Sequence, residues 1–235
     1  MKLLYEGKAK RIYQTDNPQE VICEFKNSLT AFNGEKADEE EGKGALNCEI
    51  TSIIFKALEE EGIPTHLIKQ IDSTKQLVKK VDIILIEVVV RNIAAGSLAK
   101  RLGLKEGEKL PFTIVEFYYK NDDLNDPLIN DDHAMILNLV NSREELDLLR
   151  NYGLKINDFL IKFFDKVGLD LVDFKVEFGK DENGNIILAD EITPDSCRLW
   201  DKKTGKKLDK DLFRFDLGDI KEAYSEVLKR IKESK

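Results

Sequence analysis

The sequence predicts an α+β protein, with an N-terminal antiparallel β-rich lobe and a larger mixed α/β C-terminal lobe. Short apolar runs crowd the first 25 residues, and turn-forming residues separate them. A nearly continuous β-branched run at 81–90 is typical of a buried strand. Apolar residues at helical spacing occur on both sides of this run. We therefore expect two domains, at 1–85 and 86–235, that join near residues 83–88.

In the N-terminal lobe, we expect strands at 3–6, 11–15 and 21–25. A helix is expected at 45–61, because its apolar residues recur at helical spacing and Gly62 follows. The buried strand at 81–90 then carries one acidic interruption near its end, Glu87.

The C-terminal lobe continues with a short helix, for which Ser97 is the candidate N-cap and Gly103 the end. A strand is expected at 112–119. Ser142 opens a capping-box pattern with Glu145, which predicts the start of a long helix that ends near Val167. The final element is an amphipathic helix at 219–232.

The composition excludes several classes of protein. With 235 residues, 42% hydrophobic and 35% charged, the chain has enough apolar side chains for a sizeable core. No apolar run approaches the roughly 20 residues that span a bilayer, and the N-terminus lacks a signal-peptide pattern. The net charge of −8 argues against nucleic-acid binding. Three widely spaced cysteines indicate neither a disulfide framework nor a zinc site. We expect a cytoplasmic protein without membrane or nucleic-acid partners.

The most informative segment runs from Asp173 to Phe178, where charged and apolar residues alternate. A strand here places Asp173, Lys175 and Glu177 on one face and three apolar side chains on the other. The apolar face is expected to contact a core.

A hairpin is expected after this strand, because Asn183-Gly184 readily forms a type I′ turn. With a two-residue loop, Glu177 lies directly opposite Asp190. Two carboxylates about 5 Å apart destabilise a sheet unless a cation lies between them. Because Mg²⁺ takes oxygen ligands and commonly also holds phosphates, the pair predicts a metal–phosphate site. The alternative is a solvated hairpin face. The apolar residues that flank the charged positions argue against it, and Glu191 is left on the apolar side without a role.

Two further motifs have both a functional and a structural interpretation. Lys8 and Lys10 flank Ala9 in a glycine turn, which can cover phosphates or can be an ordinary surface turn. Arg91 follows the buried strand, and small residues lead from it to Ser97. That arrangement suits either an anion at a helix start or tight packing of a loop.

Arg198 follows the proposed carboxylate strand closely in sequence, so we expect it near Asp190. Cys197 could be a nucleophile, but neither His66 nor His133 is in a context typical of a catalytic partner. We therefore interpret Cys197 as structural. The histidines also lack metal-ligand spacing.

Taken together, these motifs resemble the phosphoribosylaminoimidazole-succinocarboxamide synthase (SAICAR synthetase) family of ATP-dependent carboxylate–amine ligases. The matching blocks span nearly the whole chain in the family's order. They are YEGKAKRIY (5–13), TAFNG (30–34), VVRNIAAGSLAKRLG (89–103), KND (120–122), DP (126–127), LVDFKVEFG (171–179), ADEITPDSCRLWD (189–201) and LDKDLFR (208–214). Asn33 stands where some members carry an aspartate.

The resemblance implies a kinase-like, ATP-grasp-like arrangement with the active site in the cleft between the lobes. On the nucleotide side it implies Lys8, Ala9 and Lys10 in the loop over the ATP phosphates, Lys79 and Glu87 around adenine and ribose, and Lys120 and Asp126. On the substrate side it implies Arg91, Ser97, Asp173, Lys175, Arg198 and Arg214, with Asp211 in the same flanking motif. Lys175, Asp173 and Arg198 are the expected catalytic residues, and Glu177 and Asp190 are the expected Mg²⁺ ligands.

The implied reaction joins 5-amino-1-(5-phosphoribosyl)imidazole-4-carboxylate to L-aspartate, with ATP as co-substrate and Mg²⁺ as cofactor. We expect small-molecule partners and a homodimer. A small-molecule kinase is the alternative enzyme class, and a nucleotide-sensing module is the non-catalytic alternative. The kinase would release ADP without aspartate, and the sensing module would turn over no ATP.

Overall fold

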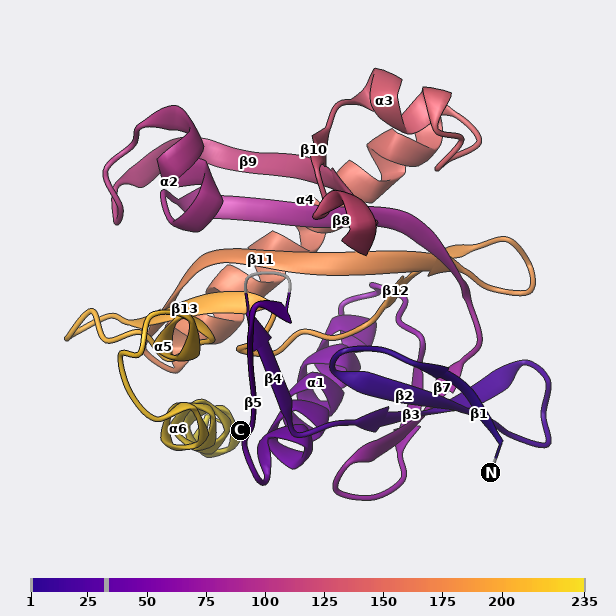
Figure 1. The fold of residues 1–235 in the computed structure, drawn as a ribbon, viewed down its shortest axis with the longest axis horizontal. Coiled ribbons are helices and arrows are strands. Elements are labelled where there is room, and N and C mark those ends of the chain that lie inside the picture. The colour runs from indigo at the N-terminus through magenta and orange to yellow at the C-terminus, as the bar shows by residue number, and fades with distance from the viewer. Residues whose placement is uncertain (1, 32–33, 235) are drawn as a thin grey trace.

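The computed structural model describes residues 2–31 and 34–234 and contains three antiparallel sheets with helices packed against them (Figure 1). The first sheet has the strand order β1-β2-β3-β7-β6. Its strands are β1 (Leu3–Glu6), β2 (Lys10–Gln14), β3 (Glu20–Phe25), β6 (Leu67–Gln70) and β7 (Lys75–Lys79). A separate hairpin pairs β4 (Ser28–Ala31) with β5 (Lys36–Glu39). Asn33 lies outside the described residues, so the expectation for its loop has no structural outcome.

The second sheet carries most of the expected site residues. Its order is β10-β9-β8-β11-β12, with β13 paired to the other end of β11. Its strands are β8 (Asp82–Ile93), β9 (Lys109–Tyr119), β10 (Leu128–Ile129), β11 (Leu169–Lys180), β12 (Ile186–Ala189) and β13 (Cys197–Asp201). The chain passes from the first sheet to the second between Lys79 and Asp82. The division into two lobes remains a prediction.

The helices cover these sheets through their apolar faces. They are α1 (Lys43–Glu60), α2 (Gly96–Leu102), α3 (Asp131–Ile136), α4 (Arg143–Lys166), α5 (Asp211–Arg214) and α6 (Ile220–Glu233), with a 3₁₀ turn, η2 (Asp122–Leu124). In Figure 1, α4 lies behind β8 and β11, while α6 packs beside α1. Gly153 of α4 lets the helix approach the sheet, because a Cβ there would lie 3.1 Å from Val88. Within the described part of the chain, no helix combines the length and apolar character that crossing a membrane requires.

The expected elements recur with shifts of a few residues, but three local expectations are wrong. Ala95, not Ser97, is the N-cap of α2. Ser142 does cap α4 by accepting the Glu145 amide, but the Glu145 carboxylate accepts the amide of Asn141 instead of completing a capping box with Ser142.

The third concerns the register of the hairpin. Glu177 pairs with Ala189, not with Asp190, because the loop is longer than two residues. The Asp181 amide donates to the Asn185 carbonyl, which leaves three residues in the loop with Gly184 at φ 79°. Asp190 therefore lies beyond the strand.

Candidate active site

Strand β11 carries the expected charged face. Phe174, Val176 and Phe178 are at most 1% exposed and belong to the main core, which confirms the alternation predicted from sequence. The intervening side chains point to the other face, where Asp173 and Lys175 enter two different clusters of charged groups.

The first group is a lysine–carboxylate cluster, made of Lys10, Lys120, Lys175, Glu87, Glu177, Asp190 and Glu191. Lys175 donates from Nζ to Glu87 Oε1 at 2.7 Å and to Glu177 Oε1 at 3.2 Å. Lys120 Nζ donates to the same Glu177 oxygen at 2.8 Å. Glu87 lies opposite Glu177 in the β8–β11 register, and the two lysines offset the repulsion between these carboxylates.

At the adjacent end of β12, Lys10 joins the cluster from β2. Its Nζ donates to Asp190 Oδ1 and lies 3.5 Å from Glu191 Oε2 and 5.0 Å from the centroid of the Phe25 ring. Asp190 has φ 60°, in the left-handed region that few non-glycine residues adopt. This conformation breaks the strand alternation, so consecutive carboxylates reach one ammonium group. The expectation that Glu191 packs on the apolar side is therefore wrong.

The cluster shifts the acidity of its members in ways that follow from geometry. Burial opposes the charge on Lys175, but Glu177 and Glu87 outweigh it and raise the pKa of Lys175 well above its usual value. Burial likewise opposes the charge on Asp190, but Lys10 and Lys175 lower its pKa. The pKa of Glu191 is raised, because burial outweighs the attraction of Lys10. The ammonium groups thus stay charged in the resting protein.

The second group is an arginine–carboxylate cluster around Asp173. Arg91, only 3% exposed, donates from NH1 to Asp173 at 3.0 Å and from Nε to Glu116 at 2.7 Å. Its NH2 group donates to the hydroxyls of Ser97 and Tyr118, each at 3.1 Å. Arg91 is therefore held rigidly in one orientation.

Arg198 approaches Asp173 from β13. Its NH1 contacts both Asp173 oxygens, at 2.9 and 3.2 Å, and its Nε donates to Asp211 at 3.0 Å. Arg198 also lies against Gly96. Its recorded partners are Asp173 and Asp211, while Asp190 contacts Lys10, so the expected proximity of Arg198 to Asp190 is not borne out by a contact between them in the described structure.

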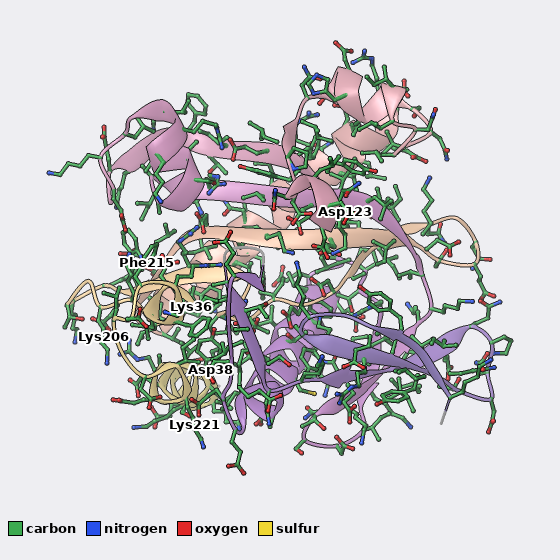
Figure 2. All side chains as sticks on the ribbon, in the orientation of Figure 1. Lys36, Asp38, Asp123, Lys206, Phe215 and Lys221 are labelled. Carbon is green, nitrogen blue, oxygen red and sulfur yellow. The ribbon has the colours of Figure 1, made fainter. Side chains whose placement is uncertain are left out.

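A pocket of about 280 Å³ brings together Lys8, Asp126 and Arg214. Arg214 donates to Asp211 at 2.7 Å, which connects the pocket to the arginine–carboxylate cluster. Lys36 of β5 contacts α5, since its Nζ donates to the Phe213 carbonyl at 2.7 Å. Figure 2 labels Lys36 and, directly after that helix, Phe215.

Ala9 and Lys79 are expected on the nucleotide side, and the hydrogen bonds described for them involve backbone carbonyls. The Ala9 carbonyl accepts the Lys26 amide, which braces the turn between β1 and β2. Lys79 is exposed, and its Nζ lies 3.5 Å from the Thr65 carbonyl. No hydrogen bond or ion pair joins Lys79 to the two clusters in the described ranges.

Sequence reasoning missed Glu116 and Tyr118, which orient Arg91. They flank buried Phe117 on β9, so strand alternation could have placed them on one face, but the contact with Arg91 depends on the β8–β9 register. Burial raises the pKa of the Cys197 thiol, in keeping with a structural role. His66 is buried, and its pKa falls to about 3.

The residues present fit Mg²⁺ as a pair of carboxylates. Among the described residues, no group of three or more His, Cys, Asp or Glu side chains could hold a metal ion. Mg²⁺ commonly uses only one or two carboxylates together with substrate phosphates. Glu177 and Asp190 supply such oxygen donors. In the structure, their carboxylates form ion pairs with lysine ammonium groups.

Comparison with known proteins identifies the family to which the chain belongs. The family model described as SAICAR synthetase matches residues 3–231. The chain belongs to the SAICAR synthetase family. Family membership assigns to it the activity of phosphoribosylaminoimidazole-succinocarboxamide synthase, a carboxylate–amine ligase of purine biosynthesis.

Individual SAICAR synthetases are similar over almost the full length. The phosphoribosylaminoimidazole-succinocarboxamide synthase of Nautilia profundicola is 86% identical and covers 100% of both chains. A crystal structure of the enzyme from Ehrlichia chaffeensis is 47% identical, with a TM-score of 0.96 and 98% coverage of both chains. A SAICAR synthetase in complex with ADP is 52% identical, with a TM-score of 0.94 and coverage of 98% of this chain and 97% of that one.

Proposed function

We propose that the chain joins 5-amino-1-(5-phosphoribosyl)imidazole-4-carboxylate to L-aspartate, with conversion of ATP to ADP and phosphate. The observation that carries this proposal is the continuity of the two clusters along β11, where Asp173 belongs to one and Lys175 and Glu177 to the other. One cluster suits a metal-bound triphosphate, and the other suits an anionic ribonucleotide. The ADP bound by a 52% identical relative supports ATP as the co-substrate.

The chemistry requires activation of a carboxylate, because its leaving group would otherwise be oxide. The substrate carboxylate takes the γ-phosphoryl group of ATP, which gives an acyl phosphate and releases ADP. The aspartate amine then attacks the acyl carbon, the carbon–oxygen bond to phosphate breaks, and the amine loses its proton. No covalent intermediate with the enzyme is needed, so catalysis consists of positioning and electrostatic stabilisation.

On the nucleotide side, Lys8 and Lys10 contact the phosphates from the turn between β1 and β2, and Ala9 fixes that turn through its backbone. The segment from Lys79 to Glu87 passes from one sheet to the other and holds adenine and ribose between the two lobes. Lys120 and Asp126 complete this side. The carbonyl of Leu85 accepts the Lys120 amide, which supports their proximity to that segment.

Glu177 and Asp190 would hold Mg²⁺. When bound, the ion supplies charge neutralisation between the phosphates and the substrate carboxylate. In the structure, Lys120 and Lys175 contact Glu177, and Lys10 contacts Asp190. These lysines are therefore already aligned with the place where phosphate charge accumulates.

On the substrate side, Arg91, Ser97 and Arg198 bind the ribonucleotide through its phosphate and carboxylate. Asp173 holds both arginines apart at fixed distances, near 3 Å from each. Lys175 offsets the charge of the reacting carboxylate. Arg214 reaches the same region through the pocket that it shares with Lys8.

The test replaces Glu177 with Gln and Asp190 with Asn, and measures ADP release with and without L-aspartate. We expect each variant to lose at least a hundredfold in turnover at saturating Mg²⁺, because a direct ligand of the ion is removed. A matched control is Asp201→Asn, which removes a carboxylate that pairs with Arg230. Unchanged turnover in both site variants would overturn the assignment of the metal pair, and ADP release without aspartate would favour a kinase. A homodimer is also part of the proposal, and light scattering tests it.

A further inference from the structure

Glu191 is a buried carboxylate that the metal pair does not explain. The residue is 6% exposed, and Oε2 has no hydrogen-bond partner in the described structure. Its ion-pair partner among the described residues is Lys10, whose Nζ lies 3.5 Å from that oxygen, and Lys43 also attracts its charge. A buried carboxylate oxygen without a hydrogen bond is costly, so its retention needs a reason.

The backbone directs Glu191 to Lys10. In a regular strand, consecutive side chains point to opposite faces, and Glu191 would then turn away from the partner of Asp190. The left-handed conformation of Asp190, at φ 60°, removes that alternation and costs about 1 kcal/mol or more for a non-glycine residue. Both carboxylates consequently face one ammonium group.

The two carboxylates are not equivalent towards Lys10. Asp190 Oδ1 accepts a hydrogen bond from Nζ, whereas Glu191 Oε2 lies at ion-pair distance without one. The Phe25 ring, whose centroid lies 5.0 Å from Nζ, is a third neighbour of the ammonium. Lys10 thus has one partner that it contacts closely and a second within reach.

We propose that Glu191 is a positioning residue that keeps Lys10 in place when Asp190 becomes a ligand of Mg²⁺. This inference rests on the proposed function, because it takes Asp190 as a metal ligand and Lys10 as a phosphate contact. A metal-bound Asp190 gives up its hold on the ammonium. Glu191 then retains Lys10 beside the incoming phosphates instead of letting it move into solvent.

The test compares ADP binding with and without Mg²⁺ by isothermal titration calorimetry. For Glu191→Gln, which preserves shape and removes charge, we expect roughly ten- to hundredfold weaker binding of Mg–ADP. Metal-free ADP should lose less than threefold, because Asp190 still holds Lys10. Glu191→Asp keeps the charge and should fall between wild type and Glu191→Gln. Asp201→Asn, which removes a partner of Arg230 at 2.8 Å, is the matched control and should bind as wild type does.

A double-mutant cycle separates positioning from a general structural effect. In a Lys10→Met background, Glu191→Gln should cause little further loss of Mg–ADP affinity, because the residue through which it acts is gone. Additive losses, or equal losses with and without Mg²⁺, would overturn the inference. If Glu191→Gln does not fold, as judged by thermal unfolding, Glu191→Asp decides the same comparison. A wild-type protein that binds no ADP would overturn the proposed function as well, whereas normal binding by Glu191→Gln overturns this inference alone.

Discussion

Replacement of Gly96 by alanine should weaken substrate binding, whereas the same replacement of Gly103 should not. Gly96 has φ 54°, and an added Cβ would lie 2.5 Å from NH2, 2.8 Å from Cζ and 2.9 Å from NH1 of Arg198. These atoms form the end of a flexible side chain, so the guanidinium moves while the backbone stays. That movement breaks contacts of 2.9 and 3.0 Å to Asp173 and Asp211.

The magnitude has two parts that the structure separates. The positive φ costs an alanine about 1–2 kcal/mol of folding free energy. Displacement of Arg198 takes a guanidinium away from buried Asp173 and Asp211, and under the proposed function it also removes charge-assisted contacts to the ribonucleotide, which corresponds to roughly ten- to hundredfold in affinity. Gly103, at the other end of α2, has φ 65° and no atom within 4 Å of an added Cβ. Gly103→Ala therefore carries the first part without the second.

The assay measures the dissociation constant for the imidazole ribonucleotide together with urea unfolding for wild type, Gly96→Ala and Gly103→Ala. Gly96→Ala should lose more stability than Gly103→Ala, because buried Asp173 and Asp211 lose their contacts to Arg198, and only Gly96→Ala should lose affinity. Equal affinities for the two variants would refute the reasoning. They would show that substrate binding does not need Arg198 in the position that Gly96 allows. A larger stability loss in Gly96→Ala together with wild-type affinity would show that the backbone moves and that Arg198 stays in place.

Three further predictions concern stability. Gly179→Ala should lower the free energy of unfolding by about 1–3 kcal/mol, because its Cβ would lie 2.5 Å from Val81; urea unfolding measures the loss, and a wild-type midpoint would contradict it. Lys43→Met should cost about 3 kcal/mol, since it leaves buried Asp195 without the ammonium that lies 2.5 Å away; an unchanged melting temperature would argue against that pair. Burial raises the pKa of Asp209 from 3.8 to about 7, so its contribution to stability is full below pH 4 and is lost as pH rises towards 7. Asp209→Asn should therefore lose less stability than wild type between pH 4 and 8 in urea titrations, and parallel curves would contradict the pKa shift.

The spacing of apolar residues along the sequence predicted much of the fold. The alternation from Asp173 to Phe178 placed β11 and its two faces correctly, because one face packs on a core and fixes the periodicity. Apolar spacing likewise located α1, α4 and α6 to within a few residues. The register of the β11–β12 hairpin failed, because it depends on whether two or three residues form the loop around Gly184. Asn-Gly occurs in both kinds of turn, so sequence alone does not fix the choice.

Prediction of the site was limited by long-range pairing. The chain segments that carry Arg91, Asp173 and Arg198 are separated by 82 and 25 residues, and only the strand register brings them together. No local pattern states that Asp173 contacts two arginines. The position of Glu191 failed for a different reason, since a single left-handed residue before it reverses the face that alternation predicts.

The charge balance of the lysine–carboxylate cluster explains why such a site stays ordered before it binds anything. Lys10, Lys120 and Lys175 face four carboxylates, those of Glu87, Glu177, Asp190 and Glu191, so each ammonium has at least one acceptor at contact distance. Without the lysines, the cross-strand carboxylates would repel one another and the face would open. Under the proposed function, a divalent cation would take the place of the lysines on Glu177 and Asp190, and the ammonium groups would then be available to phosphates. The charges that stabilise the described structure would then be the same ones that serve nucleotide binding.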